Sequence, residues 1–242
     1  YKPHVFGINN AKRAESQGWD ESSAWGTNDA GKNSDILVLR AQTSSASPLS
    51  AASDNTMIDC LGVAPTALPT AADDGFISIL HVHAAAYGET SLVCTREASG
   101  GGCEGQPLVR GVEGFQVLYG VDNVVANTAP TGTTDSVPDR YLRADQLTVT
   151  GDQEATYDNW RRVRSLRIGL VLRSQPGSAI DTTTQTLYPL GTSADSATGT
   201  TGSAFGSSGD VGAVYTAPAD RRLRQVVTFT VHLRNFQDLE PN

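Results

Sequence analysis

Two histidines, His81 and His83, come nearest by type and spacing to a metal-binding pair. Alternate side chains of an extended strand share a face, so both imidazoles are expected on the same side of a sheet. A zinc site needs further ligands, and a second group usually orients each ligating imidazole. Because no third ligand is evident in the sequence, we interpret both residues as ordinary histidines of a sheet face.

Three aspartates around a long polar segment, Asp122, Asp135 and Asp139, are the candidates for calcium binding. Carboxylate oxygens are the ligands that Ca²⁺ prefers. The segment lacks the alternating acidic residues around a central glycine that mark a strong calcium loop. We therefore keep the three residues as weak candidates and expect no resident metal ion or cofactor.

Nucleophilic and phosphate chemistry have no recognisable motif in this chain. There is no Gly-x-Ser-x-Gly elbow, and the cysteines lack the context of a catalytic thiol. The glycines at 100–102 lack the Lys and Ser/Thr that complete a phosphate-binding loop. The sequence predicts that the protein is not an enzyme. A hydrolase with two carboxylates, which folding alone brings together, is the remaining enzymatic alternative.

The three cysteines, Cys60, Cys94 and Cys103, lack the repeated close pairs of a structural zinc site. An exported protein would form one disulfide from them and leave one thiol. Cys94 and Cys103 flank a glycine-rich turn and could meet across a hairpin, while Cys60 with Cys94 is the competing pair. Either bond would stabilise the fold by roughly 3 to 4 kcal/mol through the unfolded state.

The chain is acidic, with a formal charge of −8 and a pI near 4.9. Binding to nucleic acid or to an anionic membrane surface needs a basic surface, so we expect neither. A basic cluster comprises Arg161, Arg162, Arg164 and Arg167. In an acidic protein this spacing favours an exposed, salt-bridged face over a polyanion site.

Three segments with alternating apolar residues must position these groups: 111–122, 165–173 and 221–235. Each places its apolar side chains on one face, as a one-sided strand does. In the first segment these side chains are Phe115, Val117, Tyr119 and Val121. We expect the three strands to form the middle of one antiparallel sheet.

The rest of the chain is expected to complete a single domain over residues 1–242. Residues 36–39 predict an interior strand, and residues 76–85 and 91–94 predict a hairpin. Residues 139–147 predict one or two helical turns capped by Asp139. Sheet-forming regions are expected at 34–122 and 160–236, and long loops at 123–159 and 191–210.

An irregular arm is expected at residues 1–33, with at most a short helix near residues 10–17. Trp19 and Trp25 are expected to pack this arm onto the body, since large aromatic residues in loops usually anchor them. No long amphipathic helix is predicted anywhere in the chain. The sheet must therefore find its cover in loops or in a segment outside this sequence.

Several segments, taken in order, resemble the PilW-type minor pilins of bacterial type IV pili. The matching segments are SDILVLR at 34–40, CLG at 60–62, SLVC at 91–94, QPLV at 106–109, GVEGFQVLYGVD at 111–122, and the strands within 160–174 and 221–235. They cover about half of the chain. Each is weak alone, but their order and spacing are fairly specific.

The resemblance implies an α+β, predominantly β fold: a pilin-like head with a central antiparallel sheet, long loops and few short helices. It implies a structural subunit that primes pilus assembly and sits at or near the pilus tip, aiding adhesion, twitching motility or DNA uptake. The partners it implies are other minor pilins, the major pilin and a surface receptor. It also implies a Cys60–Cys94 disulfide that leaves Cys103 unpaired.

The family's cleaved leader and its apolar N-terminal helix do not appear in this sequence. No run approaches the roughly 20 apolar residues that cross a bilayer. We expect that the natural protein carries such a segment before Tyr1, which would make it a protein of the inner membrane and periplasm before assembly and of the extracellular pilus afterwards. The alternatives are a type II secretion pseudopilin and a free-standing extracellular adhesin or glycan-binding β domain.

Overall fold

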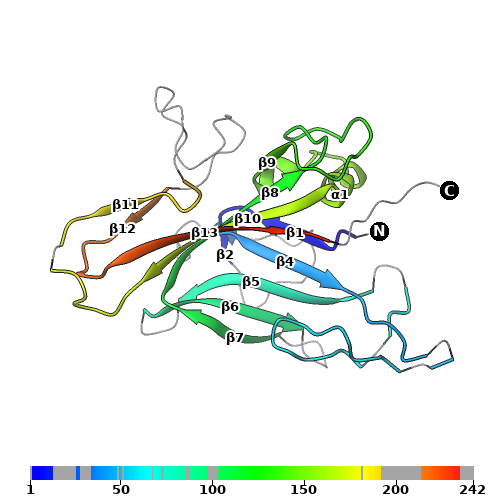
Figure 1. Cartoon of the computed structure of the whole chain (residues 1–242), viewed down its shortest axis with the longest axis horizontal. Helices are drawn as coiled ribbons and strands as arrows, with labels where there is room; N and C mark the ends of the chain where they lie inside the picture. Colours follow the sequence, from blue (N-terminus) through cyan, green and yellow to red (C-terminus); the bar gives the residue numbers. More distant parts are fainter. Residues whose placement is uncertain are drawn as a thin grey trace.

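In the residues that it describes, the computed structural model contains two larger antiparallel sheets and two small two-stranded ones (Figure 1). It describes residues 2–12, 26–27, 34–47, 49–50, 52–66, 68–71, 74–84, 88–97, 103–180, 182–191 and 214–234. The predominantly β architecture predicted from the sequence is confirmed. The prediction of a single central sheet is incomplete, because a second large sheet packs against the first.

The five-stranded sheet has the strand order β1-β4-β5-β6-β7. Its strands are β1 (Val5–Ile8), β4 (Ile36–Ala41), β5 (Phe76–Ala84), β6 (Thr90–Glu97) and β7 (Cys103–Arg110). The interior position of β4 is confirmed, since this strand pairs with β1 on one side and β5 on the other. The predicted hairpin is confirmed by the antiparallel pairing of β5 with β6.

The four-stranded sheet has the order β13-β10-β8-β9. Its strands are β8 (Val112–Val121), β9 (Arg140–Leu142), β10 (Val163–Arg173) and β13 (Arg224–His232). Ile168 of β10 lies opposite Val117 on one side and Phe229 on the other. The three segments singled out in the sequence are therefore neighbours in one antiparallel sheet, as predicted, but β13 lies at the edge of that sheet and not in its middle.

The remaining elements are short. They are the 3-10 helix η1 (Ala144–Leu147), the helix α1 (Gln153–Arg161), and the strand pairs β2 (Ala11–Lys12) with β3 (Gly26–Thr27) and β11 (Gln185–Leu187) with β12 (Tyr215–Ala217). α1 begins after Asp152, whose carboxylate accepts a hydrogen bond from the N–H of Ala155 at 3.0 Å. Such a cap satisfies one of the open N–H groups of the first helical turn.

The main core lies between the two large sheets. Phe115, Val117 and Tyr119 of β8 contribute one wall, and Ile36 and Ile79 of the five-stranded sheet belong to the same buried cluster. Trp160 of α1 completes this cluster, and its ring centre lies 4.8 Å from the ring centre of Tyr119. The sheet thus finds its cover in the second sheet and a short helix rather than in loops alone.

β8 is buried on both faces, so the prediction of a one-sided strand was wrong. Its second face carries Gln116 and Leu118. Glu113 joins this face where the β8–β10 register shifts, between the pairs Val171–Gly114 and Leu172–Val112, and all three side chains are buried. A side chain added at Gly114 would meet the ring of Tyr215 in β12. The β11–β12 pair therefore lies over this face, which local alternation could not reveal.

The sequence placed a helix and a loop where the structure has other elements. Residues 140–142 form β9, only 144–147 form a helical turn, and the residue before that turn is Arg143 rather than Asp139. α1 begins within the predicted loop at 123–159 and ends two residues beyond it. Asn10 lies in a turn and residues 11–12 form β2, while residues 13–17 of the predicted helix, both arm tryptophans and the predicted loop beyond Gly191 lie outside the described residues.

Candidate functional site

The loop that leaves β8 is fixed at its base by a buried ion pair. The Arg164 Nε lies 3.4 Å from Oδ2 of Asp122, and both side chains are almost completely buried. The same carboxylate oxygen accepts hydrogen bonds from the backbone N–H groups of Asp135 and Ser136, at 3.0 and 2.8 Å. One carboxylate therefore holds the far end of the loop against the end of β8.

Further bonds tie this loop to its surroundings. The N–H of Asn123 donates to Oδ2 of Asp139 at 2.6 Å. Arg162 donates to the carbonyl oxygens of Thr131 and Gly132, at 3.1 and 3.0 Å. These contacts give residues 123–139 a defined conformation despite their polar composition.

The exposed part of the loop carries two apolar side chains, Val125 and Val137, which are 48 % and 58 % exposed. Binding surfaces are often loops that a rigid scaffold positions. We call the surface formed by residues 123–139 the exit-loop surface. It is the candidate site for partner contacts.

The three calcium candidates all belong to this loop or its base, but each carboxylate is used in the fold. Asp122 pairs with Arg164, Asp139 accepts the N–H of Asn123, and Asp135 accepts the N–H of Val137 at 2.9 Å. Among the described residues, no three His, Cys, Asp or Glu side chains come together as a group fit for a metal ion. The arrangement supports a structural role for these acids.

The basic cluster is likewise structural, and the prediction of an exposed face was wrong for two of its members. Arg164 is buried with Asp122, while the Arg161 side chain is 8 % exposed and pairs with Asp158 and Glu154. Their charges are neutralised within the fold, because burying an unpaired charge is costly.

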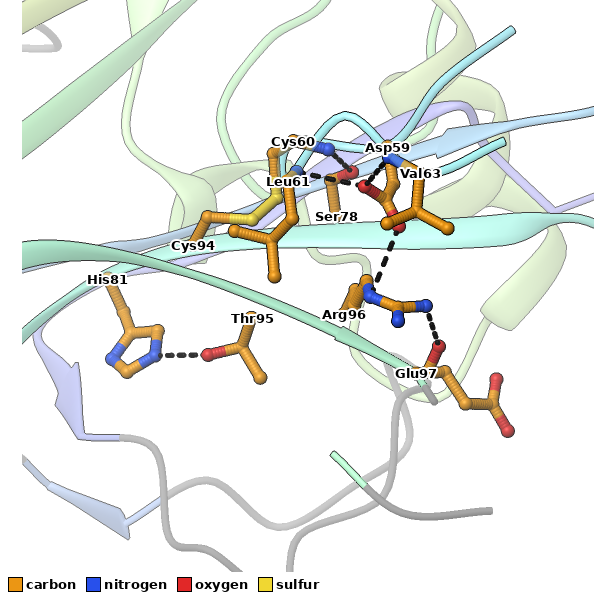
Figure 2. The surroundings of a disulfide bond; sticks show 10 residues. All are labelled: Asp59, Cys60, Leu61, Val63, Ser78, His81, Cys94, Thr95, Arg96 and Glu97. Atoms are coloured by element: carbon orange, nitrogen blue, oxygen red, sulfur yellow. Dashed lines mark hydrogen bonds and ion pairs between the residues drawn. A yellow bond between two sulfur atoms is a disulfide. The ribbon is translucent and has the colours of Figure 1, made fainter. Parts of the chain in front are cut away.

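A disulfide joins Cys60 to Cys94 of β6 (Figure 2). From the residues alone, the Cys60–Cys94 and Cys94–Cys103 pairings were alternatives. Although β6 and β7 do form a hairpin, Cys94 lies opposite Gln106, and Cys103 lies opposite Glu97 at the far end of the ladder. Cys103 is an exposed free thiol.

The disulfide also anchors the loop that begins at Asp59. The Asp59 carboxylate accepts hydrogen bonds from the N–H groups of Leu61 and Val63 at 2.8 and 3.0 Å. Its Oδ2 lies 3.5 Å from Nε of Arg96 (Figure 2). The N–H of Cys60 donates to Ser78 Oγ of β5 at 3.0 Å. This loop borders a cavity of about 550 Å³ over the ends of β5 and β6.

The two histidines share a strand but not an environment. His81 is buried, and its Nε2 lies 2.9 Å from Thr95 Oγ1. His83 is exposed, and its ring centre lies 6.5 Å from that of His81. The structure places His81 as a hydrogen-bonded histidine of the sheet.

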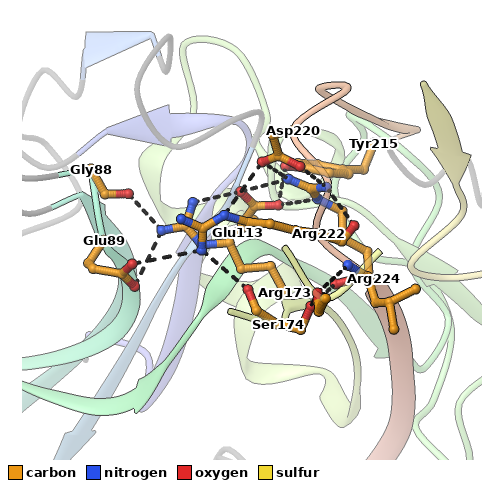
Figure 3. Close-up of polar contacts among 11 residues, drawn as sticks. Gly88, Glu89, Glu113, Arg173, Ser174, Tyr215, Asp220, Arg222 and Arg224 are labelled. Carbon is orange, nitrogen blue, oxygen red and sulfur yellow. Dashed lines mark hydrogen bonds and ion pairs between the residues drawn. The ribbon is translucent and has the colours of Figure 1, made fainter. Parts of the chain in front are cut away.

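Glu113 is the centre of a buried charge cluster that the sequence did not reveal (Figure 3). Its carboxylate lies 2.6 Å from Nε of Arg224 and 3.1 Å from Arg173, and it accepts a hydrogen bond from the Tyr215 hydroxyl at 2.7 Å. Burial and this hydrogen bond raise the pKa of Tyr215. Four strands therefore meet on one carboxylate.

The cluster continues to the surface through Asp220 and Glu89. Asp220 pairs with Arg224 at 2.7 Å, and this bond lowers the pKa of Asp220 to about 2. Glu89, before β6, lies 3.4 Å from Arg173 and 3.8 Å from Arg222. The only signal in the sequence was that two of the strands expected to be neighbours, now β10 and β13, both carry arginines. Two arginines that face each other across a sheet need an acidic partner.

Ser34 and Asp35 join the two large sheets. The N–H of Phe115 donates to Ser34 Oγ at 3.0 Å, and the N–H of Val117 donates to Asp35 Oδ2 at 2.8 Å. The other Asp35 oxygen accepts the N–H of Asn10 at 2.9 Å. Burial raises the pKa of Asp35 to about 7. These side chains pair with β8 along the edge that β9 leaves open.

A family model described as PilW, type IV pilus-assembly protein W, matches residues 79–235. The match runs from β5 to just beyond β13 and so includes the exit loop and the Glu113 cluster. No curated protein and no solved structure matches the chain. In the part of the chain that the structure describes, no helix is both long and apolar enough to span a membrane.

Proposed function

The chain belongs to the PilW family of type IV pilus-assembly proteins, and from that premise we propose that it is a minor pilin that primes assembly and occupies a position at or near the pilus tip. Membership implies involvement in pilus assembly. The role of a tip subunit, the partners and any contribution to adhesion, twitching motility or DNA uptake are parts of the proposal.

The observation that carries the proposal is the rigid mounting of the exit-loop surface within the matched region. Asp122 and Arg164 fix the loop base, while Val125 and Val137 remain exposed. A preformed surface binds with little ordering cost, and its exposed apolar side chains can be buried by a partner. Such a surface suits a subunit whose task is to hold neighbours rather than to catalyse a reaction.

The proposed partners are other minor pilins and the major pilin, which the head would contact laterally. In this proposal an apolar helix that precedes Tyr1 in the natural protein anchors the subunit in the inner membrane and then in the filament core. The head resides in the periplasm before assembly and on the extracellular pilus afterwards.

The proposal is tested by deleting the gene in its own host and complementing it with the full-length gene. We expect loss of surface pili and of twitching on deletion, and recovery on complementation. A Val125→Asp/Val137→Asp variant should complement poorly while folding normally. Intact piliation with a defect in export of folded proteins would favour the pseudopilin, and intact piliation with loss of surface attachment would favour a free adhesin.

A further inference from the structure

β13 is the last strand of the four-stranded sheet, and no described strand pairs with its outer side. The N–H of Ser174 donates to Leu223 O, and the N–H of Leu233 donates to Arg164 O. Antiparallel pairing alternates inward and outward backbone groups. The N–H and C=O groups of Val226, Thr228 and Thr230 therefore point away from β10, as do those of His232.

The C-terminal half of β13 is exposed to solvent. Residues 228–232 are all exposed, and Phe229 and Val231 are 43 % and 41 % exposed. Phe229 lies opposite Ile168, which in turn lies opposite Val117 in the core. One apolar row thus runs from the buried centre of the sheet to its open edge, where it stops without cover.

The central part of β13 lacks the sequence features that usually prevent another strand from pairing with an exposed edge. Natural edges are protected by charges, prolines, bulges or short length. β13 spans nine residues, and residues 225–231 contain no charged residue, proline or glycine. β7, one of the two edge strands of the five-stranded sheet, contrasts with β13 because it contains Pro107 and a register shift.

Charge argues against a second copy as the occupant. Residues 221–234 contain no acid, and basic side chains stand at both ends: Arg221 before the strand, and His232 and Arg234 at its end, while Arg222 already pairs with Glu89 and Asp220. Antiparallel pairing of two copies would set basic end against basic end, and parallel pairing would do the same. Like charges opposed across strands are destabilising.

We propose that β13 is an acceptor edge for an extended strand of another protein, apolar on the face that meets Phe229 and Val231 and acidic at both ends. Backbone groups of the edge would supply affinity, and the side-chain pattern would supply selectivity, as in other cases of strand addition. The added strand would extend the apolar row and cover it. This inference stands on the edge itself and does not depend on the proposed role in the pilus.

The test uses two synthetic probes with the same Thr-Val-Thr-Val-Thr centre, one with two Glu residues at each end and one with two Lys residues. Calorimetric titration at low salt should show the Glu-ended peptide binding at least tenfold more tightly, with a difference that shrinks in high salt. Amide hydrogen exchange should slow at Val226, Thr228 and Thr230. Equal affinities, or protection elsewhere than β13, would overturn the proposal.

Variants of the strand separate the backbone from the side chains. Thr230→Pro removes an outward N–H, which an edge strand tolerates, and should weaken the Glu-ended peptide at least tenfold. The matched control Thr230→Val keeps the N–H and should bind as the parent does. A double change, His232→Glu with Arg234→Glu, makes one end of the edge acidic and should remove the preference for the Glu-ended peptide.

Folding is checked by thermal unfolding of each variant. If Thr230→Pro fails to fold, the double variant His232→Glu/Arg234→Glu tests the proposal in its place. Sedimentation should show a monomer at the concentrations used. A dimer of the parent protein that the His232→Glu/Arg234→Glu change abolishes would assign the edge to a second copy and contradict the proposal.

Discussion

Arg164 holds the carboxylate of Asp122 inside the protein, with Nε 3.4 Å from Oδ2 and neither side chain accessible to solvent. Asp122 directly follows β8, and Arg164 lies at the start of the pairing strand β10. The ion pair therefore sets both the join between these strands and the path of the exit loop. This relationship connects the core of the sheet to the surface on which the proposed function rests.

Removing the cation of this pair should be costly. Arg164→Met leaves the Asp122 carboxylate buried without its charge partner, and we expect a loss of about 3 to 5 kcal/mol in the free energy of unfolding. Urea titration measures it. The double variant Asp122→Asn/Arg164→Met should recover part of the loss. An unchanged unfolding midpoint for Arg164→Met, matching that of the exposed control Arg234→Ala, would contradict this role.

The Glu113 cluster predicts a similar asymmetry. Arg173 and Arg224 lie directly opposite each other in the β10–β13 ladder, so Glu113→Gln leaves two buried cations facing one another. We expect a loss of about 3 to 5 kcal/mol by chemical denaturation. Glu89→Gln, at the half-exposed end of the cluster, is the control and should cost under about 1 kcal/mol. Equal effects would show that burial does not set the cost.

Asp35 predicts a pH dependence of stability. Because burial raises its pKa from 3.8 to about 7, the folded state holds its proton more tightly than the unfolded state. Its stabilising contribution is complete below pH 3.8 and is lost as the pH rises to 7, by an amount on the order of a few kcal/mol. Unfolding free energies from about pH 4 to 7 should fall in the parent protein and fall less in Asp35→Asn. Identical pH slopes would refute this.

The disulfide gives a simple comparison among the thiols. The double variant Cys60→Ser/Cys94→Ser opens a link across 34 residues and should cost about 3 to 4 kcal/mol of stability. Cys103→Ser should leave stability unchanged, since that thiol is exposed. Thiol titration of the unfolded, unreduced protein should count one free thiol. A count of three would mean that the bond does not form.

The strands of the four-stranded sheet could be predicted because their alternation is local. The period-2 pattern of Phe115, Val117 and Tyr119 identifies a buried face without reference to any other part of the chain. The same pattern could not show that Gln116 and Leu118 are also buried, since Tyr215 reaches that face from about a hundred residues away. Burial on the second face is a tertiary property.

The charged groups were misjudged for the same reason. Arg164 and Glu113 are of residue types that usually lie at the surface. Only folding brings each to its partner: Asp122 lies 42 residues from Arg164, and Arg224 lies 111 residues from Glu113. The helix α1 was different, because its signal was present in Asp152, a good capping residue followed by Ala155 and Trp160. The cap and the short apolar stripe fall within a polar stretch, so the helix was missed.

The most direct test of the central claim asks whether the full-length protein is a component of the pilus and contacts other subunits through the exit-loop surface. A photoreactive amino acid replaces Val137 in the host, pili are sheared from irradiated cells, and crosslinked products are identified by mass spectrometry. The account predicts the chain in the pilus fraction, crosslinked to other pilin subunits and lost when the major pilin is deleted. Its absence from sheared pili, with release into the medium unaffected by that deletion, would contradict the account.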